Sequence, residues 1–126
     1  MTDARILCLD DEPVGLAIRA TVLRYAGYDV FTASSPEEAL QILADQQIDL
    51  VISDHLLRGT TGTQVAASMK RIRPDIPILI LSGFTEAPEG MEFADFFLSK
   101  LEPPPVLLAT VDNLLTQRRS LLAAQS

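Results

Sequence analysis

Cysteine, histidine and basic residues are scarce in this sequence, and each shortage excludes a class of protein. Cys8 is the only cysteine among 126 residues, so no internal disulfide can form and a reducing compartment is expected. His55 is the only histidine, which excludes a zinc site and predicts an exposed loop residue. Lysine and arginine total 10 against 17 acidic residues, and the resulting net charge of −7 opposes direct binding to nucleic acid.

Long apolar runs are also absent. No run approaches the roughly 20 residues of a membrane helix. The N-terminus, MTDARILCLD, carries an acid where a signal peptide would carry cations. We therefore expect a cytoplasmic protein without membrane contact. The composition is globular, and the length predicts one domain over residues 1–126, with a core from about 4 to 119 and a last helix that reaches about 123.

Apolar runs of strand length alternate with stretches of helical period. The expected strands are residues 5–9, 29–33, 48–53, 76–81 and 96–99, and the expected helices are residues 14–26, 36–45, 63–73 and 106–123. Pro88 and Gly90 lie where a fourth helix would lie, before the last strand. Inside a helix they cost about 3 and about 1 kcal/mol, so this helix should be short, irregular or absent. The alternation predicts an α/β fold, doubly wound around a parallel five-stranded sheet.

In the first expected helix, apolar residues recur at helical spacing, at Val14, Ile18, Val22 and Tyr25. The last helix has more apolar residues than one buried stripe needs, namely Leu107, Leu108, Val111, Leu114, Leu115, Leu121 and Leu122. This excess predicts a partner or homodimer contact through the C-terminal helix. The alternative is that the sheet and the preceding loop cover both rows of leucines.

Polar side chains follow four of the expected strands. Asp10 and Asp11 follow the first strand, Asp54 the third, Ser82 the fourth and Lys100 the fifth. Since sites in open α/β sheets form outside the carboxyl ends of the strands, we expect these groups to converge. Crowded carboxylates favour a hard cation such as Mg²⁺, which leaves one of them able to attack phosphorus. The ammonium group would neutralise a transferred phosphoryl group, and the hydroxyl would donate a hydrogen bond to it.

The same residues carry a resemblance to a known family. The motifs are LCLDDEP at 7–13, DLVISD at 49–54, LILSG at 79–83 and FFLSK at 96–100, with Gly62 eight residues after Asp54. As a set they resemble the response-regulator receiver domains of two-component signalling, over nearly the whole chain. The resemblance implies a flavodoxin-like sandwich with strand order 2-1-3-4-5.

The resemblance also implies roles for the acids. Asp54 matches the phosphoacceptor, which takes a phosphoryl group from a histidine kinase or phosphotransfer protein. Asp11 matches the direct Mg²⁺ ligand, Asp10 matches the acid that holds metal-bound water, and the backbone carbonyl of Leu56 matches the remaining protein ligand. The implied function is a phosphorylation-switched signalling module whose only chemistry is to accept and lose this group, and not an enzyme with an external product.

A second group of residues matches the family's switch. Ser82 matches the hydroxyl that moves to the phosphate, Phe97 the aromatic residue that turns inward, and Lys100 the phosphate-binding lysine. Leu56 and Phe84 match the two positions that flank the path of the hydrolytic water. Neither side chain offers a hydrogen bond to that water, so the phosphorylated state is expected to decay slowly.

The chain departs from the family pattern at two turns. Receivers usually follow the lysine with a proline in a cis peptide, whereas here Lys100 is followed by Leu101. We expect a trans bond, because a cis bond before a residue other than proline costs about 2.5–4 kcal/mol. Arg58 stands where the family usually has a proline, four residues after the phosphoacceptor, and this predicts a looser turn.

Three other functions are alternatives to a phosphorylated receiver. A receiver-like binding module that is no longer phosphorylated would explain the missing proline, but all five site groups are present. A Mg²⁺-dependent phosphatase with an aspartate nucleophile resembles DxD motifs, and Asp10-Asp11-Glu12 lacks that spacing. A Ser82-His55-Asp54 triad is disfavoured, since adjacent residues of one loop do not orient each other as a triad requires. The sequence leaves open whether the receiver stands alone or belongs to a hybrid kinase or a longer regulator.

Overall fold

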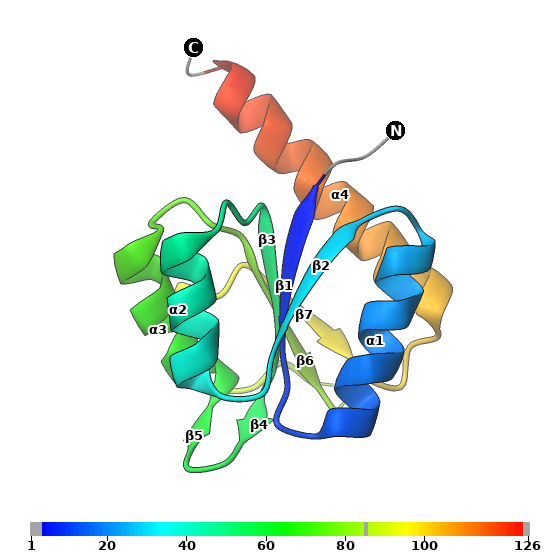
Figure 1. Ribbon diagram of the computed structural model, residues 1–126, viewed down its shortest axis with the longest axis vertical. Helices are drawn as coiled ribbons and strands as arrows, with labels where there is room; N and C mark the ends of the chain where they lie inside the picture. Colours follow the sequence, from blue (N-terminus) through cyan, green and yellow to red (C-terminus); the bar gives the residue numbers. More distant parts are fainter. Residues whose placement is uncertain (1–3, 85, 125–126) are drawn as a thin grey trace.

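A parallel five-stranded sheet forms the centre of the computed structural model, which describes residues 4–84 and 86–124 (Figure 1). Its strands are β1 (Arg5–Leu9), β2 (Asp29–Ala33), β3 (Leu50–Asp54), β6 (Ile78–Ser82) and β7 (Phe96–Ser99). They lie in the order β2-β1-β3-β6-β7, and each neighbouring pair is parallel. Two short strands, β4 (Leu56–Leu57) and β5 (Thr60–Thr61), form a separate hairpin. Without that hairpin the order is the predicted 2-1-3-4-5, and the fold class is confirmed.

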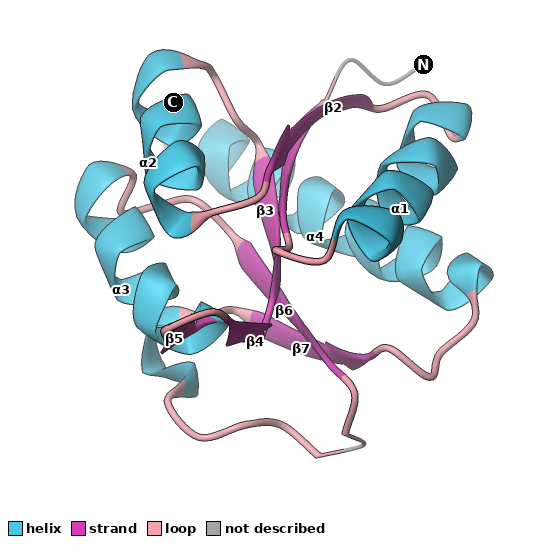
Figure 2. Ribbon diagram, turned by 60° about the horizontal axis from the view of Figure 1, so that its bottom comes forward, coloured by secondary structure: helices cyan, strands magenta, loops and turns pink. Residues whose placement is uncertain are grey.

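Helices cover both faces of the sheet. They are α1 (Pro13–Tyr25), α2 (Pro36–Asp45), α3 (Gly62–Ile72) and α4 (Pro104–Ala124). Figure 1 and Figure 2 show α1 and α4 on one face and α2 and α3 on the other. Successive side chains of a strand point to opposite faces, so one strand supplies both cores. In β1, Ile6 and Cys8 pack with α1 and α4, whereas Leu7 and Leu9 pack with α2 and α3.

Side-chain caps start two of the helices beside the carboxyl end of the sheet. Glu12 caps α1, and its Oε2 accepts the N–H of Gly15 at 2.6 Å. Thr61 caps α3 in a reciprocal box, in which Thr61 Oγ1 accepts the Gln64 N–H at 3.3 Å and Gln64 Oε1 accepts the Thr61 N–H at 3.2 Å. Each cap satisfies backbone donors that the first helical turn leaves free.

No α-helix forms between β6 and β7 in the part of this segment that the structure describes, in agreement with the expectation from Pro88 and Gly90. The described part of the segment between β6 and β7 contains one short 3₁₀ turn, η1 (Met91–Phe93). A lysine–aspartate pair fixes the end of this segment, because Lys70 Nζ lies 2.8 Å from Asp95 Oδ2. The same oxygen accepts the Ile78 N–H at 2.8 Å, which ties the segment to the start of β6.

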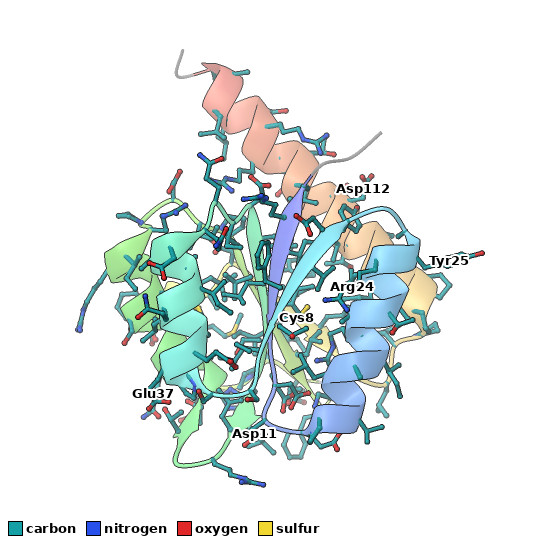
Figure 3. The ribbon with its side chains drawn as sticks, viewed as in Figure 1. Cys8, Asp11, Arg24, Tyr25, Glu37 and Asp112 are labelled. Atoms are coloured by element: carbon teal, nitrogen blue, oxygen red, sulfur yellow. The ribbon has the colours of Figure 1, made fainter. Side chains whose placement is uncertain are left out.

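The apolar residues that recur at helical spacing in α1 do not form its buried face. Val14, Ile18 and Tyr25 are 65%, 60% and 94% exposed, and Figure 3 shows Tyr25 pointing away from the fold. The buried face is instead Leu16, Ala20 and Leu23. Both sets have helical spacing, and periodicity alone cannot choose between them. The small Ala20 lets the helix lie close to the sheet, so packing decides which set turns inward.

The apolar residues of the last helix divide between the two alternatives. Val111, Leu114 and Leu115 are buried against the sheet. Leu121 and Leu122, in the part of α4 that projects beyond the sheet in Figure 1, are 64% and 45% exposed. A homodimer through this end of α4 stays a prediction. No helix within residues 4–84 and 86–124, α4 included, has the length and apolar character to cross a membrane.

Cys8 lies in the middle of β1 between the sheet and α1 (Figure 3). The thiol is fully buried, and this burial raises its pKa to about 12. A thiol with so high a pKa carries almost no thiolate at neutral pH. Cys8 is therefore a small core residue, as expected.

Close packing around Gly62 leaves no room for a side chain at this position. A Cβ at this position would lie 2.4 Å from the backbone oxygen of Asp54, whereas a Cβ at Gly83 would meet nothing within 4 Å. We predict that Gly62→Ala lowers the free energy of unfolding by about 1–3 kcal/mol, the usual cost of overpacking. The matched control Gly83→Ala should stay within about 0.5 kcal/mol of wild type in the same urea titration. Equal stability of the two variants would contradict this account.

Candidate functional site

Strand register brings the predicted site residues to one edge of the sheet. β1 and β3 are aligned so that Asp10 leaves its strand beside the end of the strand that carries Asp54. β6 and β7 are aligned so that Lys100 follows beside Ser82, whose carbonyl accepts the Lys100 N–H at 2.7 Å. Figure 3 shows Asp11 at the same end of the molecule, next to the β4–β5 hairpin.

Asp54 and Lys100 form the central pair of the site. The carboxylate of Asp54 is almost fully buried, and its Oδ1 lies 2.5 Å from Lys100 Nζ. Burial raises the pKa of Asp54, and the charge of Asp10 raises it further, while the hydrogen bond and charge of Lys100 lower it. Burial has the largest effect, so the pKa remains above the ordinary value despite the ion pair. The folded environment of Asp54 therefore disfavours the ionised form of its carboxyl group.

Asp10 is held on both of its oxygens. Its Oδ1 accepts the Glu12 N–H at 2.9 Å, and its Oδ2 forms an ion pair with Arg19 Nη1 at 3.2 Å. The side chains of Asp10 and Arg19 are 1% and 11% exposed, so this pair is buried on both sides. Arg19 was not among the site residues predicted from the sequence. It lies three residues after Leu16 and four before Leu23, both buried, and this spacing places it on the buried face of α1.

Asp11 contacts the hairpin that follows Asp54. Its Oδ2 accepts the Arg58 N–H at 2.7 Å and lies 4.0 Å from Arg58 Nε. A proline at position 58 could not donate this hydrogen bond, because proline has no N–H. The expected loose turn is therefore wrong: β4 and β5 pair as a tight hairpin, with Gly59 at φ 76°. The departure from the family pattern supplies a tie between the hairpin and Asp11.

The turn after Lys100 is held without a proline. Residues 100 and 101 are joined by a trans peptide, as expected, since no cis bond occurs among the described residues. Ser99 holds the turn instead: its Oγ accepts the Leu101 N–H at 3.1 Å, and its carbonyl accepts the Glu102 N–H at 3.1 Å. These bonds direct the Lys100 side chain over the end of β3, where it reaches Asp54.

The remaining predicted residues come from the loop after β3, from β6 and the loop that follows it, and from β7. Ser82 is buried, and its Oγ accepts the Phe84 N–H at 3.3 Å. Leu56 and Phe84 are 61% and 66% exposed, while Phe97 in β7 is half-buried. Their switch and rate-tuning roles stay predictions.

His55 is not the exposed loop residue that the sequence suggested. It is half-buried, and its backbone carbonyl accepts the Gly62 N–H at 2.7 Å. Its Nδ1 is buried and has no hydrogen-bond partner within the described ranges. Asp54 meanwhile pairs with Lys100, so His55 and Asp54 do not form two members of a triad.

The donor set fits Mg²⁺ in its chemistry. Asp10, Asp11 and Asp54 offer hard carboxylate oxygens at one edge of the sheet, which is the ligand type that Mg²⁺ prefers. As they lie, these side chains are each turned toward a cation, and the described part of the chain holds no ready cluster of three metal-ligating side chains. A metal ion would therefore have to compete with these cations for the carboxylates.

Comparison with known proteins places the chain in a family. A model of the response regulator receiver domain matches residues 6–112. The chain belongs to this family. It is 31% identical over 118 residues to the transcriptional regulatory protein GlrR of Escherichia coli, and 32% identical over 121 residues to the phosphate regulon transcriptional regulatory protein PhoB of Pseudomonas aeruginosa. These matches cover 90% and 91% of the receiver but only 27% and 53% of the two relatives.

Solved structures agree with this placement. The response regulator protein TrrA of Thermotoga maritima, in complex with Mg²⁺ and BeF, matches the receiver with a TM-score of 0.81 and 30% identity. The match covers 88% of this chain and 98% of that one. The receiver is thus homologous to two-component response regulators, whose signalling is phosphorylation-switched.

Because the pKa of Asp54 is raised, replacing this residue with a neutral one should stabilise the fold by an amount that depends on pH. A carboxyl group with a higher pKa in the folded state binds its proton more readily there, so its ionisation opposes folding. Asp54→Asn should therefore raise the free energy of unfolding at pH 7. The gain should shrink toward zero as the pH falls below about 3.8, the ordinary pKa of the group. Urea titrations across this pH range would measure it. A gain that does not change with pH would contradict the assignment.

Proposed function

We propose that Asp54 is the phosphoacceptor of this receiver. The observation that carries the proposal is the contact of the buried Asp54 carboxylate with Lys100 Nζ at 2.5 Å, at the edge where Asp10 and Asp11 also lie. Two groups far apart in sequence meet there at a cost, because the carboxylate is desolvated and lies near other acids. Such an arrangement favours a reaction that consumes negative charge on the acid.

The transfer step follows from this geometry. A carboxylate oxygen of Asp54 forms a bond to the phosphorus of a phosphohistidine, and the phosphorus–nitrogen bond breaks. Its electron pair stays on the imidazole nitrogen, which then takes up a proton. Lys100 already engages Oδ1, so Oδ2 is the better nucleophile. Lys100 then pairs with an oxygen of the phosphoryl group, and Ser82 rotates from the Phe84 N–H to donate to another.

Asp10, Asp11 and the backbone carbonyl of Leu56 are the groups that would hold Mg²⁺ with Asp54. When bound, the ion supplies positive charge that offsets the carboxylates and the phosphoryl oxygens. TrrA, the relative from Thermotoga maritima, was solved with Mg²⁺ and BeF, which supports this part of the proposal. Phe97, half-buried beside this edge, would turn inward when Ser82 moves.

The phosphodonor partner is a histidine kinase or a phosphotransfer protein. Such a partner must bring its histidine in line with Asp54, so it must contact the start of α1 at the same edge. Val14 and Ile18 are exposed there, and Ile18 lines a cavity of about 380 Å³ beside Asp10 and Lys100. This apolar surface supports docking of a protein rather than of nucleic acid. Residues 1–126 would form one such domain, acting in the cytoplasm without enzymatic turnover of an external substrate.

Chemical labelling tests the phosphoacceptor directly. After incubation with acetyl phosphate and Mg²⁺, wild type should gain one phosphoryl group by mass spectrometry, and Asp54→Asn should gain none. Asp11→Asn should be labelled much more slowly, because it lacks part of the anionic metal cradle. The exposed Asp45→Asn serves as control and should behave as wild type. Undiminished labelling of Asp54→Asn, or steady hydrolysis of a generic phosphate ester, would contradict the proposal.

Slow loss of the phosphoryl group is a second expectation. Leu56 and Phe84 are both exposed beside the acceptor and offer no hydrogen bond to an attacking water. We predict that Leu56→Asn and Phe84→Glu each speed the decay of the phosphoprotein, by between a few-fold and about 10²-fold, because they help to position that water. The measurement is a decay time course after removal of the donor. Unchanged half-lives in both variants would show that shielding at these positions does not set the rate.

A further inference from the structure

We propose that Arg19 is a positioning residue that competes with Mg²⁺ for Asp10 and thereby weakens metal binding. The inference rests on the proposed function, in which Asp10 belongs to the metal site. Its basis is the ion pair between Arg19 Nη1 and Asp10 Oδ2 at 3.2 Å, buried on both sides.

Both carboxylate oxygens of Asp10 already have a partner. Oδ2 is engaged by Arg19, and Oδ1 accepts the N–H of Glu12 at 2.9 Å. Water bound to a metal ion must donate to one of these oxygens, and the Arg19 Oδ2 contact is the one that a side chain can release. Arg19 lies in the second turn of α1 and lines the same cavity as Lys100, so it has room to turn aside.

Arg19 acts differently from the other cations of the site. Lys100 pairs with the acceptor itself, and Arg58 is 92% exposed, so its charge is screened by solvent. Arg19 is 11% exposed and pairs with an acid that is 1% exposed. Its charge is therefore the one that water screens least among the partners of Asp10 and Asp11.

Loss of this charge has two consequences of opposite sign. The buried Asp10 carboxylate loses its partner, so the fold without metal becomes less stable. At the same time Mg²⁺ no longer faces a neighbouring cation, so it binds more tightly. We expect the Kd for Mg²⁺ to fall about tenfold. The reason is that a singly charged cation and a divalent ion beside the same carboxylate repel each other, even in a solvent-like dielectric.

The experiment compares variants by isothermal titration with MgCl₂ and by thermal unfolding with and without MgCl₂. Arg19→Gln should bind Mg²⁺ about tenfold more tightly than wild type. It should unfold at a lower temperature without Mg²⁺ and regain most of that loss when Mg²⁺ is added. Arg19→Lys, which keeps the charge, should stay near the wild-type Kd.

Arg118→Gln is the matched control. The Arg118 side chain is 16% exposed and forms ion pairs with the more exposed Asp49 and Asp75, away from the site. The variant should lose some stability, keep the wild-type Kd, and regain none of that loss when Mg²⁺ is added. A structural role alone would make Arg19→Gln behave like this control.

Two results would overturn the inference, and they are distinguishable. If wild type binds Mg²⁺ and Asp11→Asn does not, but Arg19→Gln binds with an unchanged or weaker Kd, Arg19 does not compete with the metal and the proposed site stands. If wild type binds no Mg²⁺, the metal site fails and the inference fails with it.

Discussion

Charge balance at the carboxyl end of the sheet is the constraint on which the rest of the site depends. Asp10, Asp11 and Asp54 lie at one edge, and burial makes their mutual repulsion costly. Each acid is turned toward a cation from another element: Arg19 of α1, Arg58 of the hairpin, and Lys100 after β7. The site is therefore a set of three acid–cation pairs, and in the proposed function a metal ion and a phosphoryl group would replace these partners.

Hydrogen bonds compensate for the places where the chain departs from its family. Arg58 stands where the family usually has proline, and its backbone N–H ties the hairpin to Asp11. Leu101 stands where another proline is usual, and Ser99 holds that turn through its side chain and its carbonyl. The missing fourth helix is replaced by a segment that the Lys70–Asp95 pair fastens to β6. In each case a hydrogen bond does the positioning that proline or a helix would otherwise do.

Much of this could be predicted from the sequence, because the signals are local. Apolar runs separated by helical stretches predicted the parallel sheet, the resemblance to receiver domains implied its strand order, and polar residues at strand ends predicted which groups would converge. Pro88 and Gly90 predicted the missing helix. The local pattern does not decide between two solutions that share one period. Val14, Ile18 and Tyr25 repeat with the helical period as Leu16, Ala20 and Leu23 do, and only the second set is buried. Arg19, which lies on that buried face, could not be predicted from the spacing.

The sequence by itself determined the fold class, the chemistry available at the edge of the sheet, and the likeness to receiver domains. These depend on residue type and spacing along the chain, which the fold does not alter. Only the tertiary structure decided which face of α1 is buried, which cation pairs with which acid, and that Arg58 and Ser99 hold their turns through hydrogen bonds. The reason is physical: a helix phase and an ion pair are selected by packing and desolvation between distant segments, and neither is encoded in a local pattern.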